Sequence, residues 1–75
     1  MDYEDWLEEN PIKKHLKKTG KSQTQFAQQV DTSLNSLYKW LQGIADPSDV
    51  SLDKIIGVIG ESFPKQWETW KTNIP

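Results

Sequence analysis

The segment SQTQFAQQVDTSLNSLYKWLQG, which spans Ser22–Gly43, contains two helix-forming stretches that are interrupted only at residues 30–33. A break of this length leaves no room for a linker, so the second helix must turn sharply against the first. Asp31 stands at the reversal, and aspartate adopts the left-handed backbone conformation more readily than most residues. The segment therefore predicts a helix, a tight turn and a second helix.

Helix signals flank this corner. Ser22 and Ser33 stand where the two helices need N-caps, and the second helix runs to Gln42 before Gly43. The first helix carries an apolar stripe, which consists of Phe26, Ala27 and Val30. Upstream, Asn10 can cap a helix that starts at Pro11, ends at Gly20 and turns Ile12 and Leu16 inward.

Further helices are expected at both ends of the chain. Pro47 and Ser48 begin a helix that ends at Gly60, with a buried face formed by Leu52, Ile55, Ile56 and Ile59. Residues 61–75 can form a short helix, and residues 2–9 can form one helical turn with Tyr3, Trp6 and Leu7 on one face. The sequence thus predicts one all-α domain, residues 1–75, of four or five helices with a helix-turn-helix unit at about residues 22–43.

Length and composition exclude several classes of function. A chain of 75 residues can bury one core but is too short to enclose a deep catalytic cavity, so we expect no enzyme activity. Cysteine is absent and His15 is the only histidine, so we expect no metal site and no cofactor. We also expect no small-molecule ligand. The sequence has no signal-peptide pattern and no membrane-spanning apolar stretch, which indicates a cytoplasmic protein.

The charges are distributed unevenly. The formal net charge is −2, but residues 10–45 contain six lysines and a single acid, Asp31, a local balance of +5. Residues 1–9 contain five acids. All nine basic residues are lysine, so the side chain that most often reads guanine, arginine, is missing.

The corner and its surroundings also match a known pattern. The matching residues, at fixed spacing, are Ser22-Gln23, Phe26-Ala27, Val30, Ser33, Leu37, Trp40, Gly43, Pro47-Ser48, Leu52, Lys54 and Ile55. From Asn10 to Gly60 the sequence therefore resembles the phage Cro/repressor type of helix-turn-helix, the Xre-like family. The resemblance implies a lambda-repressor-like fold and a transcriptional regulator that binds the major groove of double-stranded DNA. Because of the small size of the chain, we expect repression by occlusion of a promoter.

The resemblance also implies which residues contact DNA. In such proteins the second helix of the corner enters the major groove with its N-terminal end first. This places four residues at base edges: Ser33, Leu34, Asn35 and Lys39. Asn35 can bond to an adenine or remain a solvated surface residue, Leu34 can contact a thymine methyl group or pack inward, and Lys39 can reach a guanine or a phosphate or remain solvated.

Phosphate contacts follow from the same resemblance. Gln23 matches the phosphate-binding glutamine of the family, and the further candidates are Lys21, Ser36, Tyr38 and Gln42. Trp40 is assigned to the core. The family usually has glycine where this chain has Asp31 and an aliphatic residue at Thr32. The carboxylate weakens phosphate binding unless it points away from DNA.

The C-terminal segment suggests an assembly. Phe63, Trp67 and Trp70 carry more apolar surface than a short helix needs, and the family usually binds paired half-sites as dimers. We therefore expect a homodimer through residues 61–75 on a pseudo-palindromic operator. Alternatively, these aromatic residues only complete the core of the monomer.

A function of another class is also compatible with the fold. The chain can be a protein-interaction module, such as an antirepressor or the antitoxin of a toxin–antitoxin pair, and its net negative charge and lack of arginine favour this alternative. A DNA-binding protein is expected to gather Lys13 or Lys14, Lys21 and Lys39 on the side that carries Asn35.

Overall fold

The computed structural model describes residues 1–75 and contains only helices and their connections. The six helices are α1 (Tyr3–Glu8), α2 (Pro11–Thr19), α3 (Gln23–Gln29), α4 (Leu34–Leu41), α5 (Asp49–Ile59) and α6 (Phe63–Thr72). The all-α prediction is confirmed. There is one helix more than expected because the Asp2 side chain accepts a hydrogen bond from the Asp5 amide at 2.8 Å and starts a complete helix α1. No helix combines the length and the apolar character needed to cross a membrane.

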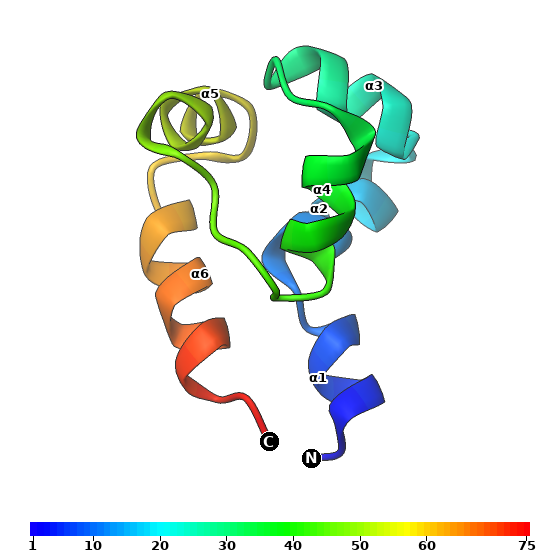
Figure 1. Cartoon of the computed structure of the whole chain (residues 1–75), viewed down its shortest axis with the longest axis vertical. Coiled ribbons are helices and arrows are strands. Elements are labelled where there is room, and N and C mark those ends of the chain that lie inside the picture. Colours follow the sequence, from blue (N-terminus) through cyan, green and yellow to red (C-terminus); the bar gives the residue numbers. More distant parts are fainter.

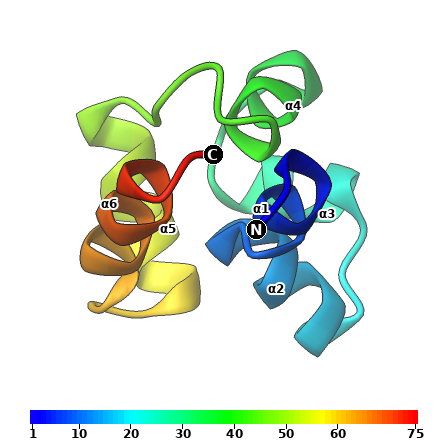
Figure 2. The ribbon, with the colours of Figure 1, turned by 90° about the horizontal axis from the view of Figure 1, so that it is seen from below.

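The helices form two groups (Figure 1). Helices α5 and α6 pack against each other on one side, and α1 to α4 lie on the other, where α3 packs against α4. Helix α6 bridges the groups through its contact with α2. Seen from below in Figure 2, the two chain ends lie next to each other, as they do in Figure 1.

The helix ends occur where the sequence predicts them. Asn10 caps α2 by accepting hydrogen bonds from the amides of Ile12 and Lys13, at 2.9 and 3.1 Å. Ser22, Ser33 and Ser48 each accept a bond from the amide three residues later, and so cap α3, α4 and α5. These caps satisfy amides that have no partner within the helix.

The core also follows the expected apolar faces, with one exception. The fully buried side chains include Ile12, Phe26, Val30, Leu37 and Ile55. The prediction for Ile56 is wrong, because this residue is half-buried and does not pack against the core. The buried face of α5 is centred on Ile55, so Leu52, Val58 and Ile59 share it, whereas Ile56 is rotated about 100° away.

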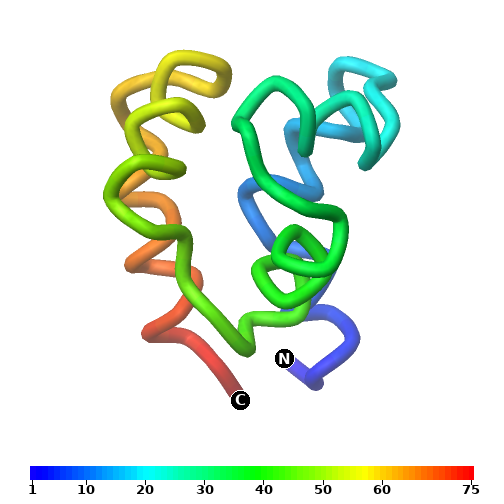
Figure 3. Tube along the Cα trace, turned by 45° about the horizontal axis from the view of Figure 1, so that its top comes forward, coloured from blue at the N-terminus to red at the C-terminus, as the bar shows by residue number.

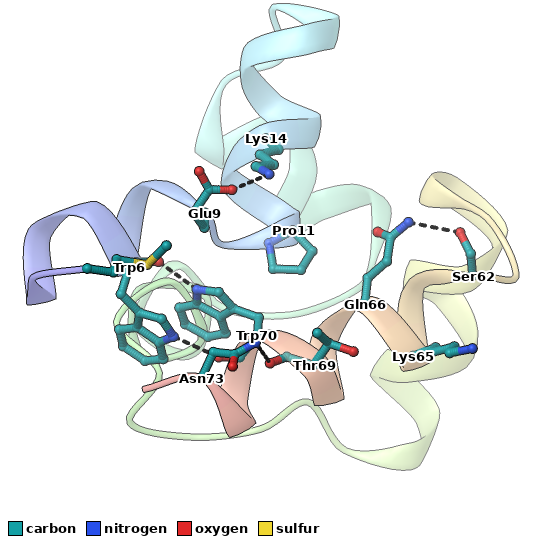
Figure 4. A pocket seen from close by; sticks show the side chains of 11 residues that line it. Trp6, Glu9, Pro11, Lys14, Ser62, Lys65, Gln66, Thr69, Trp70 and Asn73 are labelled. Carbon is teal, nitrogen blue, oxygen red and sulfur yellow. Dashed lines mark hydrogen bonds and ion pairs between the residues drawn. The ribbon is translucent and has the colours of Figure 1, made fainter. Parts of the chain in front are cut away.

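A pair of tryptophans joins the two ends of the chain. The rings of Trp6 and Trp70 are stacked with centroids 4.1 Å apart and planes at 3°. Each indole N–H donates to the backbone carbonyl of the other residue, at 2.7 Å from Trp6 and 2.6 Å from Trp70 (Figure 4). The pair therefore holds α1 on α6 with all four of these polar groups satisfied.

The aromatic residues of the C-terminal segment lie inside the monomer. Phe63, Trp67 and Trp70 are 0%, 7% and 5% exposed. The sequence suggested that they carry surplus apolar surface, but this surface is used within the chain, because α1 supplies Trp6 as a partner for Trp70. Among the large apolar side chains of residues 61–75, Ile74 is the exposed one.

The acidic N-terminal segment pairs with the lysines of α2. Glu8 accepts hydrogen bonds from Lys13 at 2.7 Å and Lys17 at 2.5 Å, and Glu9 pairs with Lys14. The bonds from Lys13 and Lys17 lower the pKa of Glu8 from 4.5 to about 2. Much of the positive charge counted in residues 10–45 is therefore balanced locally.

His15 lies in a different electrostatic setting. Its ring packs against Phe26 with centroids 5.9 Å apart, and its Nε2 atom is buried without a hydrogen-bond partner. Burial, together with the positive charges of Lys21 and Lys18, lowers the pKa of His15 below its usual range. The folded chain therefore favours the neutral imidazole.

The contact between Gly43 and the tryptophan pair gives a first prediction. A Cβ atom on Gly43 would lie 2.6 Å from Cη2 of Trp6 and 3.1 Å from Cη2 of Trp70. Gly20 has the same φ of 73° but open space around it, which makes it a matched control. We expect Gly20→Ala to lower the free energy of unfolding by about 1 kcal/mol through backbone strain. Gly43→Ala should lower it by a further 1–3 kcal/mol, roughly, through overpacking. Urea denaturation measures the free energy of unfolding of both variants. Equal losses in the two would contradict close packing of the tryptophan pair against Gly43.

The environment of His15 gives a second prediction. Because its pKa is lower in the folded chain than in the unfolded chain, the unfolded chain binds more protons near about pH 6. Stability from this group is complete above the unfolded pKa and is lost as the pH falls from the unfolded pKa through the lower folded pKa. We expect the melting temperature to decrease between pH 8 and 5.5, and His15→Gln should reduce that decrease. A wild-type melting temperature that is constant over this range would exclude the effect.

Candidate nucleic-acid interface

The corner between α3 and α4 has the predicted geometry. Asp31 is the only residue other than glycine with a positive φ, at 53°. The amide of Thr32 donates to the carbonyl of Ala27 at 2.9 Å, which closes the end of α3. Val30 before the turn and Leu37 after it are both fully buried. A left-handed residue between two buried anchors thus sets the direction of α4.

The carboxylate of Asp31 is paired with a distant lysine. Nζ of Lys54, on α5, lies 3.1 Å from Oδ2 of Asp31. The pair is largely exposed, so its contribution to stability is small. The pair instead changes the charge at the corner, because Lys54 places a positive charge beside Asp31, the single acid of residues 10–45.

Helix α4 presents one polar face to solvent. The exposed residues of α4 and of its C-cap, Gln42, follow the spacing of a single helical face: Asn35, Tyr38, Lys39 and Gln42. We call these four residues the outer face of α4. Leu37 and Trp40 lie on the opposite side and are buried in the core. The outer face is therefore free to contact a partner while the inner face fixes the helix.

Three other predicted contact residues of α4 are already engaged. The hydroxyl of Ser33 lies 3.1 Å from both the amide and the hydroxyl of Ser36, so both side chains take part in the helix cap. Leu34 is half-buried and packs against the core. Of the four predicted base-contacting residues, Asn35 and Lys39 are exposed with no competing hydrogen bond within the chain.

The start of α3 supplies a second exposed group. Gln23 is the first residue of α3 and is exposed, and Lys21 lies half-buried in the turn before it. Between them, Ser22 and Gln25 form a reciprocal cap, in which the Ser22 amide donates to Oε1 of Gln25 at 2.9 Å. This cap holds the backbone near Gln23 without using the Gln23 side chain.

The lysines divide into two sets. Five are in ion pairs within the chain: Lys13, Lys14, Lys17, Lys54 and Lys71. The sequence carries no signal for these pairs, in which Lys13 and Lys14, two of the lysines that a DNA-binding protein is expected to gather beside Asn35, pair with Glu8 and Glu9. The unpaired lysines are Lys18, Lys21, Lys39 and Lys65. The unpaired lysines within or directly before α3 and α4 are therefore Lys21 and Lys39.

The corner gives a third prediction. Asp31→Ala and Asp31→Gly both remove the pair with Lys54, but only alanine is strained at a φ of 53°. We expect the glycine variant to have a free energy of unfolding about 1–2 kcal/mol above that of the alanine variant. Lys54→Met removes the pair alone and should cost less than about 1 kcal/mol. Equal stability of the two Asp31 variants in urea denaturation would show that the corner carries no left-handed strain.

Comparison with known proteins agrees with this geometry. Residues 12–66 match the helix-turn-helix family model HTH_3, which covers the corner, the outer face of α4 and the helices that support them. Comparisons with curated proteins and with solved structures give no match. The match spans well over half of the 75 residues, so the chain belongs to the Xre- and Cro-like helix-turn-helix family and is a DNA-binding regulator of that type.

Proposed function

We propose that this protein is a sequence-specific repressor that binds a promoter in the bacterial cytoplasm and blocks its use. The observation that supports this proposal is the outer face of α4, where Asn35, Tyr38, Lys39 and Gln42 are all exposed. Inserted in the major groove, one such polar face can reach both base edges and the flanking phosphates. Occupation of the promoter alone accounts for repression.

The proposal gives each exposed side chain a role. Asn35, near the N-terminal end of α4, donates to N7 and accepts from N6 of one adenine, and Lys39 reaches a guanine one turn later. Gln23, Lys21, Tyr38 and Gln42 contact phosphates. Ser33 and Ser36 keep their capping bond, and the exposed part of Leu34 lies against a thymine methyl group. Base specificity then depends mainly on Asn35.

We further propose that two copies bind the half-sites of a pseudo-palindromic operator, about one helical turn apart. Because Phe63, Trp67 and Trp70 are buried, a contact between copies through residues 61–75 has to use the exposed Ile74 and its polar neighbours. Two copies also double the number of phosphate contacts, which is important for a chain with few unpaired lysines.

Protein binding remains the second candidate, and one observation favours it. The loop between α4 and α5, residues 42–48, has no basic residue and exposes Ile44, which is 69% accessible. A loop with an exposed aliphatic side chain and no basic residue suits a protein partner better than a phosphate backbone. Selection of bound sequences from random duplex DNA decides between the two functions, because a protein-interaction module enriches no sequence.

The role of Asn35 gives the fourth prediction. If Asn35 reads an adenine, Asn35→Ala should cost roughly 1–3 kcal/mol on the selected site and leave non-specific binding nearly unchanged. Gln23→Ala removes a phosphate contact and should instead weaken all sequences alike. Binding titrations with cognate and scrambled duplexes measure both effects.

Both variants should remain folded, because Ser22 and Ser33 still cap α3 and α4 in each of them. Circular dichroism should show unchanged helix content. An Asn35→Ala variant that keeps both the affinity and the base preference of the wild-type chain would refute the assigned role while leaving the fold intact.

A further inference from the structure

The end of α4 is held by residues from both ends of the chain. The Tyr3 hydroxyl donates to the carbonyl of Gln42 at 3.4 Å, and Nζ of Lys71 donates to the carbonyl of Gly43 at 2.6 Å. Trp67 donates from its indole N–H to Oδ1 of Asp46 at 3.0 Å. All three donors lie outside residues 12–66, the part of the chain that matches the helix-turn-helix family. The terminal helices thus add contacts of their own to the family fold.

The stacked tryptophans complete this arrangement. Trp6 and Trp70 lie directly against Gly43, whose Cα has no room for a methyl group. Figure 3 shows that the chain leaves α4 close to both termini before it crosses to α5. We call Tyr3, Trp6, Trp67, Trp70 and Lys71 the terminal clasp. The clasp therefore encloses the first residues after α4 with an aromatic surface and three hydrogen-bond donors.

Lys71 makes the most specific contact of the clasp. Its ammonium group bonds the Gly43 carbonyl and lies 3.5 Å from Oδ1 of Asp46, and its side chain is 29% exposed, the least of the ion-paired lysines. A charge-assisted bond in a half-buried site is stronger than an exposed ion pair. A positive charge also interacts favourably with the C-terminal end of a helix, where carbonyls lack partners.

We propose that Lys71 is a positioning residue for DNA recognition, which fixes the C-terminal end of α4 and so sets the orientation of its outer face in the major groove. This inference rests on the proposed function. Helix α4 has only eight residues, so a small rotation at its C-terminal end changes the position of Asn35 and Lys39 together. Side chains that recognise a partner need to be held within about 0.5 Å of their productive geometry. A mobile C-terminal end of α4 would not hold them to this precision.

The test compares two lysines on the same helix. Lys71→Met removes the ammonium group but keeps the apolar stem, and Lys65→Met removes the same charge from an exposed, unpaired position of α6. Lys71→Arg restores a cationic donor. We expect Lys71→Met to lower the ratio of cognate to non-specific affinity about tenfold, Lys65→Met to leave the ratio unchanged, and Lys71→Arg to recover most of the loss.

Hydrogen exchange provides a readout without DNA. Amide protons of residues 42–45 should exchange faster in Lys71→Met than in Lys65→Met, while those of α2 should be unaffected. If the two methionine variants have the same affinity ratio, the positioning role is overturned even though the wild-type chain binds its site. If the wild-type chain shows no sequence preference at all, the proposed function fails and this role fails with it, whatever the exchange rates are.

Discussion

The stacked pair of Trp6 and Trp70 is the interaction on which the rest of the structure depends. It closes the chain between residues 64 positions apart, and each indole satisfies the backbone carbonyl of the other. Without it, α1 would lose two buried hydrogen bonds to α6, and the Gly43 backbone would lose the surface against which it packs. The buried core is small, so a contact that unites α1, α6 and the end of α4 is a substantial addition to it.

Electrostatics explains how a chain with a net charge of −2 can belong to a DNA-binding family. Glu8 and Glu9 form ion pairs with lysines of α2, Asp46 pairs with Lys71, and Asp31 pairs with Lys54. These acids therefore take part in the fold, and none of them lies on the outer face of α4. Lysines that are paired within the chain are less able to bind DNA phosphates. DNA binding would therefore depend more on the few unpaired lysines and on polar side chains.

The sequence predicts those features whose cause is local. Caps such as Asn10 and Ser22, and the left-handed Asp31, follow from the chemistry of one or two residues, and helical periodicity identifies the apolar and polar sides of α4. Contacts between distant residues are not encoded in this way. Their spacing places Trp67 and Trp70 on one side of a short helix but does not show that Trp6 covers Trp70, which is why surplus apolar surface was expected at the C-terminal end. The bond from Lys71 to Gly43 has no sequence signal, because any lysine can donate to any carbonyl.

The position of the clasp separates two tasks within one small domain. The proposed contact residues lie on the outer face of α4, whereas residues beyond the family-matched segment hold the end of that helix. A substitution in the clasp can therefore alter how the outer face is presented without changing any residue on it. Such a change acts through packing and hydrogen bonding at Gly43, which lies against the two indoles and accepts a bond from Lys71. If Lys71 has the proposed positioning role, the terminal helices α1 and α6 give this chain a second route to altered recognition, independent of the outer face of α4.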